Sequence, residues 1–381
     1  MNALLCCRPC QLIAPVALVL LLVVPRAQAE VVQWLYQVAV PVSDQSPAAR
    51  TDAGQAALEE VLVRVSGVAP LPQSRELADA LRRPERYYSQ FRYLAPTADQ
   101  PELKARFDFA PAVVLDLAKS LALPVWWANR PRVVPWVLIR DGSERVVIED
   151  AAAPFAAALM DRARQRGVPV ALPQADETGL APVPPQLLAR GDRAVLTSAS
   201  VPYDAEALGL VQVTRRGGRY VARGSLLLAD EAEAAADAAT TAPGPQELSF
   251  QVAAVDLAGL GAATADAMAE QLAARFAASG GGGVLAVRLH DVTNPTDYAT
   301  VMAYLRGLEF VDRVALQALA GQVLELAIAS QADARRFVSL LSVDGVLGEQ
   351  PPAAAGTGLA TPLPPELGGA IALRYLGAAD P

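Results

Sequence analysis

Few side chains in this sequence could carry out a reaction. His290 is the only histidine, and no nucleophile motif lies near it, so a Ser-His-Asp arrangement has little support. Zinc and other transition-metal sites usually need several His or Cys ligands, which one histidine cannot supply. We therefore expect no metal and no cofactor, and we interpret His290 as a structural or surface residue at the end of an apolar strand.

Two carboxylates and two glycine-rich stretches are the remaining candidates for catalysis or phosphate binding. Asp176 and Glu177 follow a predicted strand and could serve a hydrolase as acid and base, although adjacent residues seldom face one cleft. The stretch GLGAAT from Gly259 has two of the three glycines of a dinucleotide-binding pattern. The glycine run at 280–283 leads from a helix into a strand, which reverses the order of a phosphate loop. We assign no catalytic residue and keep a carboxylate-dependent hydrolase as the alternative interpretation.

Aromatic residues suggest a binding surface instead. Trp126 and Trp127 are neighbours, so a strand at this position would point one of them outward. The sequence therefore predicts that Trp127, together with Asn129 and Arg130, contacts a partner. The alternative is that these aromatic side chains fill a core or a seam.

Charge and cysteine content limit the class of protein. The chain has 32 basic and 40 acidic residues, a net charge of -8, which argues against nucleic acid as a partner because such binding needs a basic footprint. The 3 cysteines, Cys6, Cys7 and Cys10, all lie near the amino terminus. If that terminus is removed, the remaining chain has no disulfide and must derive its stability from packed cores.

The amino terminus has the layout of a secretion signal. Arg8 precedes an apolar run from Leu12 to Val24, and small residues end at Ala29. The run of about 13 residues is shorter than the roughly 20 that span a bilayer. We predict cleavage between Ala29 and Glu30 and a periplasmic protein, with an uncleaved anchor as the alternative and the one route to a membrane.

The stretch after the signal combines a strand, a turn and a capped helix. Val32, Trp34, Tyr36, Val38, Val40 and Val42 alternate along the predicted strand. Asp44 and Ser46 are predicted to accept hydrogen bonds from free amides at the start of the following helix. Gly67 is predicted to end that helix in a left-handed conformation.

The rest of the sequence indicates an α/β (α+β) protein with several domains, in which mixed sheets are layered with helices. We expect a carboxy-terminal ferredoxin-like βαββα unit, completed by VDGVL at 343–347 or by GAIALRYL at 369–376. The predicted segments are a signal (1–29), an N-terminal α/β domain (30–123), a central α/β domain (124–278) with a flexible acidic loop (230–246), the ferredoxin-like domain (284–347), a mobile Pro/Ala/Gly-rich segment (349–367), and a terminal strand and tail (368–381).

Several of these stretches together resemble a bacterial family. The resemblance lies in VPVSDQSPAAR, ALEEVLVRVSG, PVWWANRPRVVPWVLI and RGVPVALPQAD. The resemblance covers most of the mature chain. The family is catalogued as a domain of unknown function, number two-thousand-and-sixty-six, and implies a periplasmic protein of Gram-negative bacteria. It supplies no established reaction, so no catalytic residue is carried over.

We therefore expect an exported, non-enzymatic protein that binds or assembles an envelope protein, either through sheet edges or through the surface around Trp127 to Arg130. The hydrolase of envelope material remains the alternative from another functional class.

Overall fold

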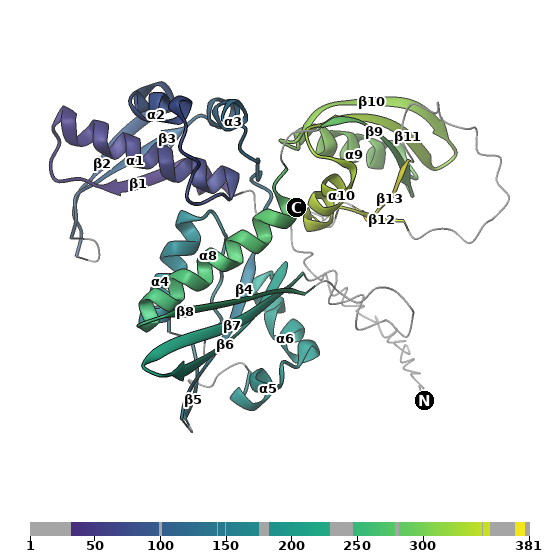
Figure 1. The fold of residues 1–381 in the computed structure, drawn as a ribbon. Helices are drawn as coiled ribbons and strands as arrows, with labels where there is room; N and C mark the ends of the chain where they lie inside the picture. Colours follow the sequence, from purple (N-terminus) through teal and green to yellow (C-terminus); the bar gives the residue numbers. More distant parts are fainter. Residues whose placement is uncertain are drawn as a thin grey trace, which may run out of the picture.

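The computed structural model describes residues 32–98, 101–142, 144–148, 150–174, 183–228, 247–278, 282–344, 346–350 and 370–377. Within these ranges the chain forms three lobes, each built on one sheet (Figure 1). The expected α/β (α+β) class with several domains is confirmed. Several predictions fall outside the described residues: the cleavage site at Ala29 and Glu30, Asp176 with Glu177, the acidic loop 230–246 and nearly all of the segment 349–367.

The first lobe is an antiparallel sheet packed against helices. Strand β3 (Lys104–Phe109) lies between β1 (Gln37–Pro41) and β2 (Tyr88–Leu94). Its other elements are the helices η1 (Gln33–Tyr36), α1 (Pro47–Ser66), α2 (Arg75–Leu81), η2 (Pro84–Arg86) and α3 (Pro111–Ser120). The burial of β3 alternates strictly, since every second side chain faces the core that α1 covers.

The strand predicted over 32–42 is shorter than expected. Residues 33–36 form a 3₁₀ turn in which Leu35 is fully buried while Trp34 is only half-buried. A 3₁₀ turn has three residues per turn, so the two-residue alternation cannot hold across it. The alternation begins only at β1.

The central lobe is a mixed sheet between two helical layers. The strands are β4 (Val133–Asp141), β5 (Glu144–Val147), β6 (Ala207–Arg216), β7 (Arg219–Leu228) and β8 (Leu248–Ala254), in the order β5-β4-β6-β7-β8 with β4 and β6 parallel. Helices α4 (Pro154–Gln165) and α8 (Leu257–Phe276) pack on one face (Figure 1). The short helices α5 (Pro185–Arg190), α6 (Arg193–Ser200) and η3 (Val201–Tyr203) lie on the other face.

Two local details concern how α4 and α8 pack and how the chain continues after α4. At Gly261, in α8, a Cβ atom would overlap the carbonyl oxygen of Phe155, so a glycine allows α8 to lie directly against α4. Residues 168–173 form no strand beyond one isolated bridge between Val170 and Val133, the first residue of β4.

The third lobe has the expected β-α-β-β-α order of elements: β9 (Gly283–His290), α9 (Pro295–Gly307), β10 (Val311–Ala320), β11 (Val323–Ser330) and α10 (Ala334–Asp344). Both proposed closing stretches contribute a strand, β12 (Leu347–Glu349) and β13 (Ile371–Tyr375). The sheet order is β10-β11-β9-β13-β12, and β13 is parallel to β9. The sheet therefore holds one strand more than the four of a simple βαββαβ unit.

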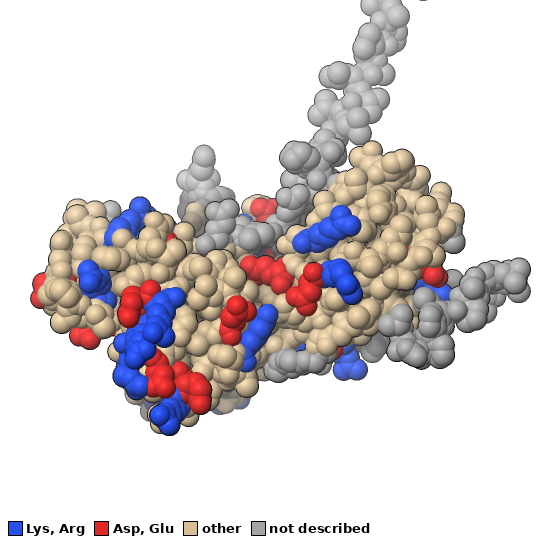
Figure 2. Space-filling view, turned by 90° about the horizontal axis from the view of Figure 1, so that it is seen from above, with Lys and Arg blue, Asp and Glu red and all other residues tan. Residues whose placement is uncertain are grey.

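One continuous set of buried apolar side chains reaches all three lobes, and a smaller core lies under α5 and α6. Helix α8 crosses the central sheet, and its carboxy-terminal end reaches the point where the lobes meet (Figure 1). Basic and acidic side chains lie in mixed groups on the face seen in Figure 2. Within the described ranges no helix is both long and apolar enough to cross a membrane.

Candidate functional site

The residues predicted to form a binding surface lie inside the protein. Trp127 is 2 % exposed and Arg130 is 0 % exposed, while Asn129 is half-buried. The Trp127 ring packs against Phe310 of the third lobe, with 5.3 Å between ring centroids. Asn129 donates from Nδ2 to the carbonyl oxygen of Leu340 at 3.0 Å.

The prediction of an outward surface at Trp127, Asn129 and Arg130 is therefore wrong. Apart from isolated bridges at Val125 and Asn129, residues 124–130 are not part of a strand, so the alternation of faces does not apply to them. They run through the junction between the lobes, where Trp126 and Trp127 are both buried. The alternative interpretation, that these side chains fill a core or a seam, is the one the structure shows, and the seam lies between lobes.

Arg130 connects four backbone carbonyl groups at this junction. Its Nε donates to Trp127 at 2.8 Å, Nη1 to Gly167 at 2.8 Å, and Nη2 to Arg64 at 2.7 Å and Trp126 at 2.5 Å. Its guanidinium carbon lies 4.1 Å from the centroid of the Trp126 ring. Burial lowers the pKa of Arg130 to about 9, which leaves the guanidinium charged at neutral pH. The role of Arg130 is structural.

Arg64 makes a similar set of contacts at the end of α1. Its Nη1 donates to the carbonyl oxygens of Trp34 at 3.1 Å and Gln37 at 2.8 Å, and its Nη2 contacts Glu60 Oε1 at 2.5 Å. Burial lowers the pKa of Arg64, and the neighbouring Glu60 opposes that shift. Glu60 therefore forms an ion pair within the first lobe.

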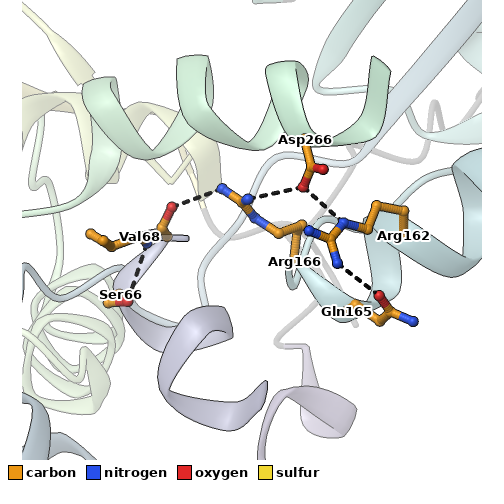
Figure 3. Close-up of polar contacts among 7 residues, drawn as sticks. Ser66, Val68, Arg162, Gln165, Arg166 and Asp266 are labelled. Carbon is orange, nitrogen blue, oxygen red and sulfur yellow. Dashed lines mark hydrogen bonds and ion pairs between the residues drawn. The ribbon is translucent and has the colours of Figure 1, made fainter. Parts of the chain in front are cut away.

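A third buried arginine joins the first lobe to α8. Arg166 donates from Nη2 to the carbonyl oxygen of Gly67 at 3.0 Å and from Nη1 to Asp266 Oδ1 at 2.9 Å (Figure 3). The same Oδ1 accepts from Arg162 Nε at 2.8 Å. Burial lowers the pKa of Arg166, and Asp266 opposes the shift. Asp266 therefore contacts two guanidinium groups at once, and Glu270 also acts electrostatically on Arg166.

Beside this network is an open cleft of about 550 Å³. We call it the α1–α8 cleft, because α1 of the first lobe and α4 and α8 of the central lobe contribute most of its walls. Its lining residues are Ala56, Glu59, Glu60, Val63, Ala69, Pro70, Leu71, Arg162, Gln165, Arg166, Asp266 and Glu270. A second hollow of about 360 Å³ shares Ala69 and Glu270 with it and reaches Arg336 of the third lobe.

The charged groups of the cleft favour binding of a ligand over catalysis. General acid–base catalysis requires a group that is free to exchange a proton with the substrate. Asp266 is held by Arg162 and Arg166, and Glu60 is held by Arg64. No group of three or more potential metal-ligating side chains occurs among the residues that the structure describes. The remaining acids of the cleft, Glu59 and Glu270, are exposed on different helices.

The three predicted capping residues are confirmed. Asp44 Oδ1 accepts from the amide of Ser46 at 2.7 Å, and Ser46 Oγ accepts from the amide of Ala49 at 3.2 Å. Hydrogen bonds from the side chain and the amide of Ser46 lower the pKa of Asp44, with a smaller contribution from Ser43. Gly67 ends α1 with φ 70°, and its amide donates a hydrogen bond to the carbonyl oxygen of Val63. The turn at Asp44 and Ser46 therefore has a structural role, and neither residue lines the α1–α8 cleft.

A further hollow of about 540 Å³ lies beside β8, an edge strand of the central sheet. Ser249 and Gln251 of β8 line it together with Arg223 of β7, whose Nε donates to Gln251 Oε1 at 2.9 Å. We predicted from the sequence that a partner could bind at a sheet edge. This hollow lies beside such an edge, so it is a second candidate contact site.

The sequence predictions missed the α1–α8 cleft. Its charged residues come from three helices that are distant in the sequence, so no single stretch displays them together. The available signal was the four-residue spacing of Arg162 and Arg166, which places both side chains on one side of a helical stretch. It does not reveal that Asp266 lies opposite them.

A match to a known family exists only for the first lobe and the start of the junction segment. Residues 29–127 match a family described as a domain of unknown function (DUF8605). A domain of unknown function is therefore present, as expected, but the matched family has a different number from the expected one, and the match does not extend over most of the chain. The matched residues end in the segment that enters the junction. No curated protein and no solved structure matches the chain.

Proposed function

We propose that this is an exported, non-enzymatic protein that binds another protein of the bacterial envelope through the α1–α8 cleft. The signal-like amino terminus supports export to the periplasm. We also propose that the chain is related to the periplasmic family numbered two-thousand-and-sixty-six. We further propose that its third lobe is a variant of the ferredoxin-like fold.

The observation that carries the proposal is the cleft itself. It lies where buried arginines fix the first lobe to the central lobe, so its walls are held in a defined geometry. Preformed walls reduce the ordering cost of binding. Sites for small molecules are lined mostly by apolar and aromatic groups, whereas half of the residues that line this cleft are charged and none is aromatic. Such a surface suits a segment of a protein.

Site-specific photo-crosslinking in the exporting cell tests this proposal. A photoreactive phenylalanine analogue replaces Ala56 or Gln165, which are exposed on opposite helices of the cleft, or Thr51 as an exposed control on α1. We expect one envelope protein to crosslink from Ala56 and Gln165 but not from Thr51, and to bind the purified protein in calorimetry.

Equal crosslinking from Thr51, or no crosslinking from either cleft position, would contradict the binding function. Recovery of the chain in the cytoplasmic fraction alone would contradict export. Turnover of envelope material by the purified protein would favour the hydrolase instead.

A further inference from the structure

We infer that two copies of this chain associate through strand β8, which pairs antiparallel with β8 of the second copy. The two central sheets then form one continuous sheet across a two-fold axis. This inference goes beyond the proposed function and does not involve the α1–α8 cleft. It depends on how β8 differs from the other edge strands of the described sheets.

Strand β8 is an edge strand without the usual protection. It lies at one end of the strand order of the central sheet and, among the described strands, pairs only with β7 (Figure 1). Native proteins protect edge strands with charged side chains, proline, bulges or very short strands. β8 has 7 residues, none of them charged and none a proline, and its register with β7 has no shift. Its free edge can therefore accept another strand.

The other edge strands of the described sheets each carry at least one such protection. β5 has 4 residues and β12 has 3. β1 ends at Pro41, and β2 contains Arg92. β10 contains Asp312 and Arg313 and has two register shifts against β11. Among the described edges, β8 is therefore the one that is open to pairing.

The sequence of β8 complements itself in antiparallel register. With Gln251 on the two-fold axis, Phe250 lies opposite Val252 of the second copy, and both belong to the face that packs on the core. An aromatic side chain opposite a β-branched one is a favourable cross-strand pair. Ser249 lies opposite Ala253 on the other face, so the register brings no two charges together.

Gln251 adds a reciprocal contact at the axis. It is exposed, it lines the hollow of about 540 Å³, and its Oε1 accepts from Arg223 Nε at 2.9 Å. A side-chain amide oxygen can accept two hydrogen bonds, and the amide nitrogen can donate two. Each Gln251 can therefore donate from Nε2 to Oε1 of its counterpart, while that oxygen keeps its contact with Arg223.

The charges next to β8 are compatible with this pairing. The chain has a net charge of -8, so two copies associate best through a neutral region. Glu247, which precedes β8, forms an ion pair with Arg193 at 3.0 Å. Asp256, which follows β8, caps α8 by accepting from the amide of Gly259 at 2.6 Å. Both neighbouring acids are thus already engaged, and β8 itself is neutral.

Sedimentation velocity of the purified protein tests the inference. One pair of short strands is a small interface, so we expect a dissociation constant on the order of 10 μM. The protein should change from monomer to dimer between about 1 and about 200 μM, without larger species, because a two-fold contact is closed. A monomer over this whole range would overturn the inference.

The decisive variants are Gln251→Lys and Gln251→Glu. Each places two like charges opposite each other at the axis, so we expect each dimer to weaken by about tenfold or more. An equimolar mixture of the two variants should dimerise again, because opposite charges then meet across the axis. The matched control Gln317→Lys changes an exposed glutamine of the edge strand β10 and should leave the dissociation constant within about twofold.

Hydrogen–deuterium exchange of the original protein is a second measurement that needs no variant. The amides of β8 should exchange more slowly at high than at low protein concentration, while those of β10 should not change. Equal exchange of β8 at both concentrations would contradict the pairing. A dimer that persists in both Gln251 variants, or a mixture of the folded variants that stays monomeric, would overturn it as well.

Discussion

Arg130 donates from Nη2 to the carbonyl oxygen of Arg64 at 2.7 Å, which fixes the junction segment to the last turn of α1. The same guanidinium holds Gly167, which follows α4, through Nη1 at 2.8 Å. One buried side chain thus joins the first lobe to the central lobe. Because the walls of the α1–α8 cleft come from these two lobes, Arg130 also maintains the shape of the cleft without lining it.

Replacement of Arg130 by leucine should destabilise the protein by roughly 3 kcal/mol or more, because several buried carbonyl groups lose their donor at once. Chemical denaturation followed by tryptophan fluorescence measures this, since Trp126 and Trp127 report on the junction. The control Arg216→Leu changes an exposed residue and should shift stability by less than about 0.5 kcal/mol. Similar losses for both variants would contradict the structural role of Arg130.

Gly67 should tolerate alanine much less well than Gly217. Both residues have positive φ values, 70° and 54°, so each substitution should cost about 1–2 kcal/mol from backbone strain. A Cβ atom at Gly67 would also overlap Ala273 of α8, whereas nothing lies within 4 Å at Gly217. We expect an additional loss of about 1–3 kcal/mol for Gly67→Ala, from overpacking between α1 and α8. Equal melting temperatures for the two variants would contradict this packing.

Removal of the hydroxyl group of Ser46 should lower stability by about 1 kcal/mol, the usual effect of losing a helix cap. The amide of Ala49 loses its acceptor, and no part of the cleft is altered. Thermal unfolding of Ser46→Ala and of Ser43→Ala, a neighbour that caps no helix, provides the comparison. Unchanged melting together with loss of partner binding would indicate that this turn has a functional role instead.

The caps were predictable and the junction was not, for a physical reason. Asp44, Ser46 and Gly67 act on backbone groups within four residues of themselves, so a short stretch of sequence contains the whole interaction. Arg130 acts on Arg64 and Gly167, which are 66 and 37 residues away. The sequence around Arg130 shows a charged residue beside two tryptophans, which is equally typical of a surface patch and of a buried seam.

Acid should destabilise the protein partly through three capping carboxylates. Hydrogen bonds lower the pKa of Asp44, Asp297 and Asp333 below the ordinary value near 3.8. Each contribution is therefore complete above the unfolded pKa and is lost as the pH falls through the lower folded pKa. Asparagine keeps an acceptor oxygen but does not titrate. In denaturation experiments at pH 7 and pH 3, the triple Asp→Asn variant should lose less stability on acidification than the original protein.

Asp266 and Glu270 lie one helical turn apart on α8 and both line the cleft, but they should behave differently when neutralised. Asp266→Asn should lower stability by about 1–3 kcal/mol, because the buried guanidinium of Arg166 loses its counter-charge. Glu270→Gln should leave stability within about 0.5 kcal/mol, because the side chain is exposed and forms no ion pair within the described residues. Urea denaturation of both variants measures the difference. A large loss for Glu270→Gln would mean that the fold needs this carboxylate as a second counter-charge for Arg166.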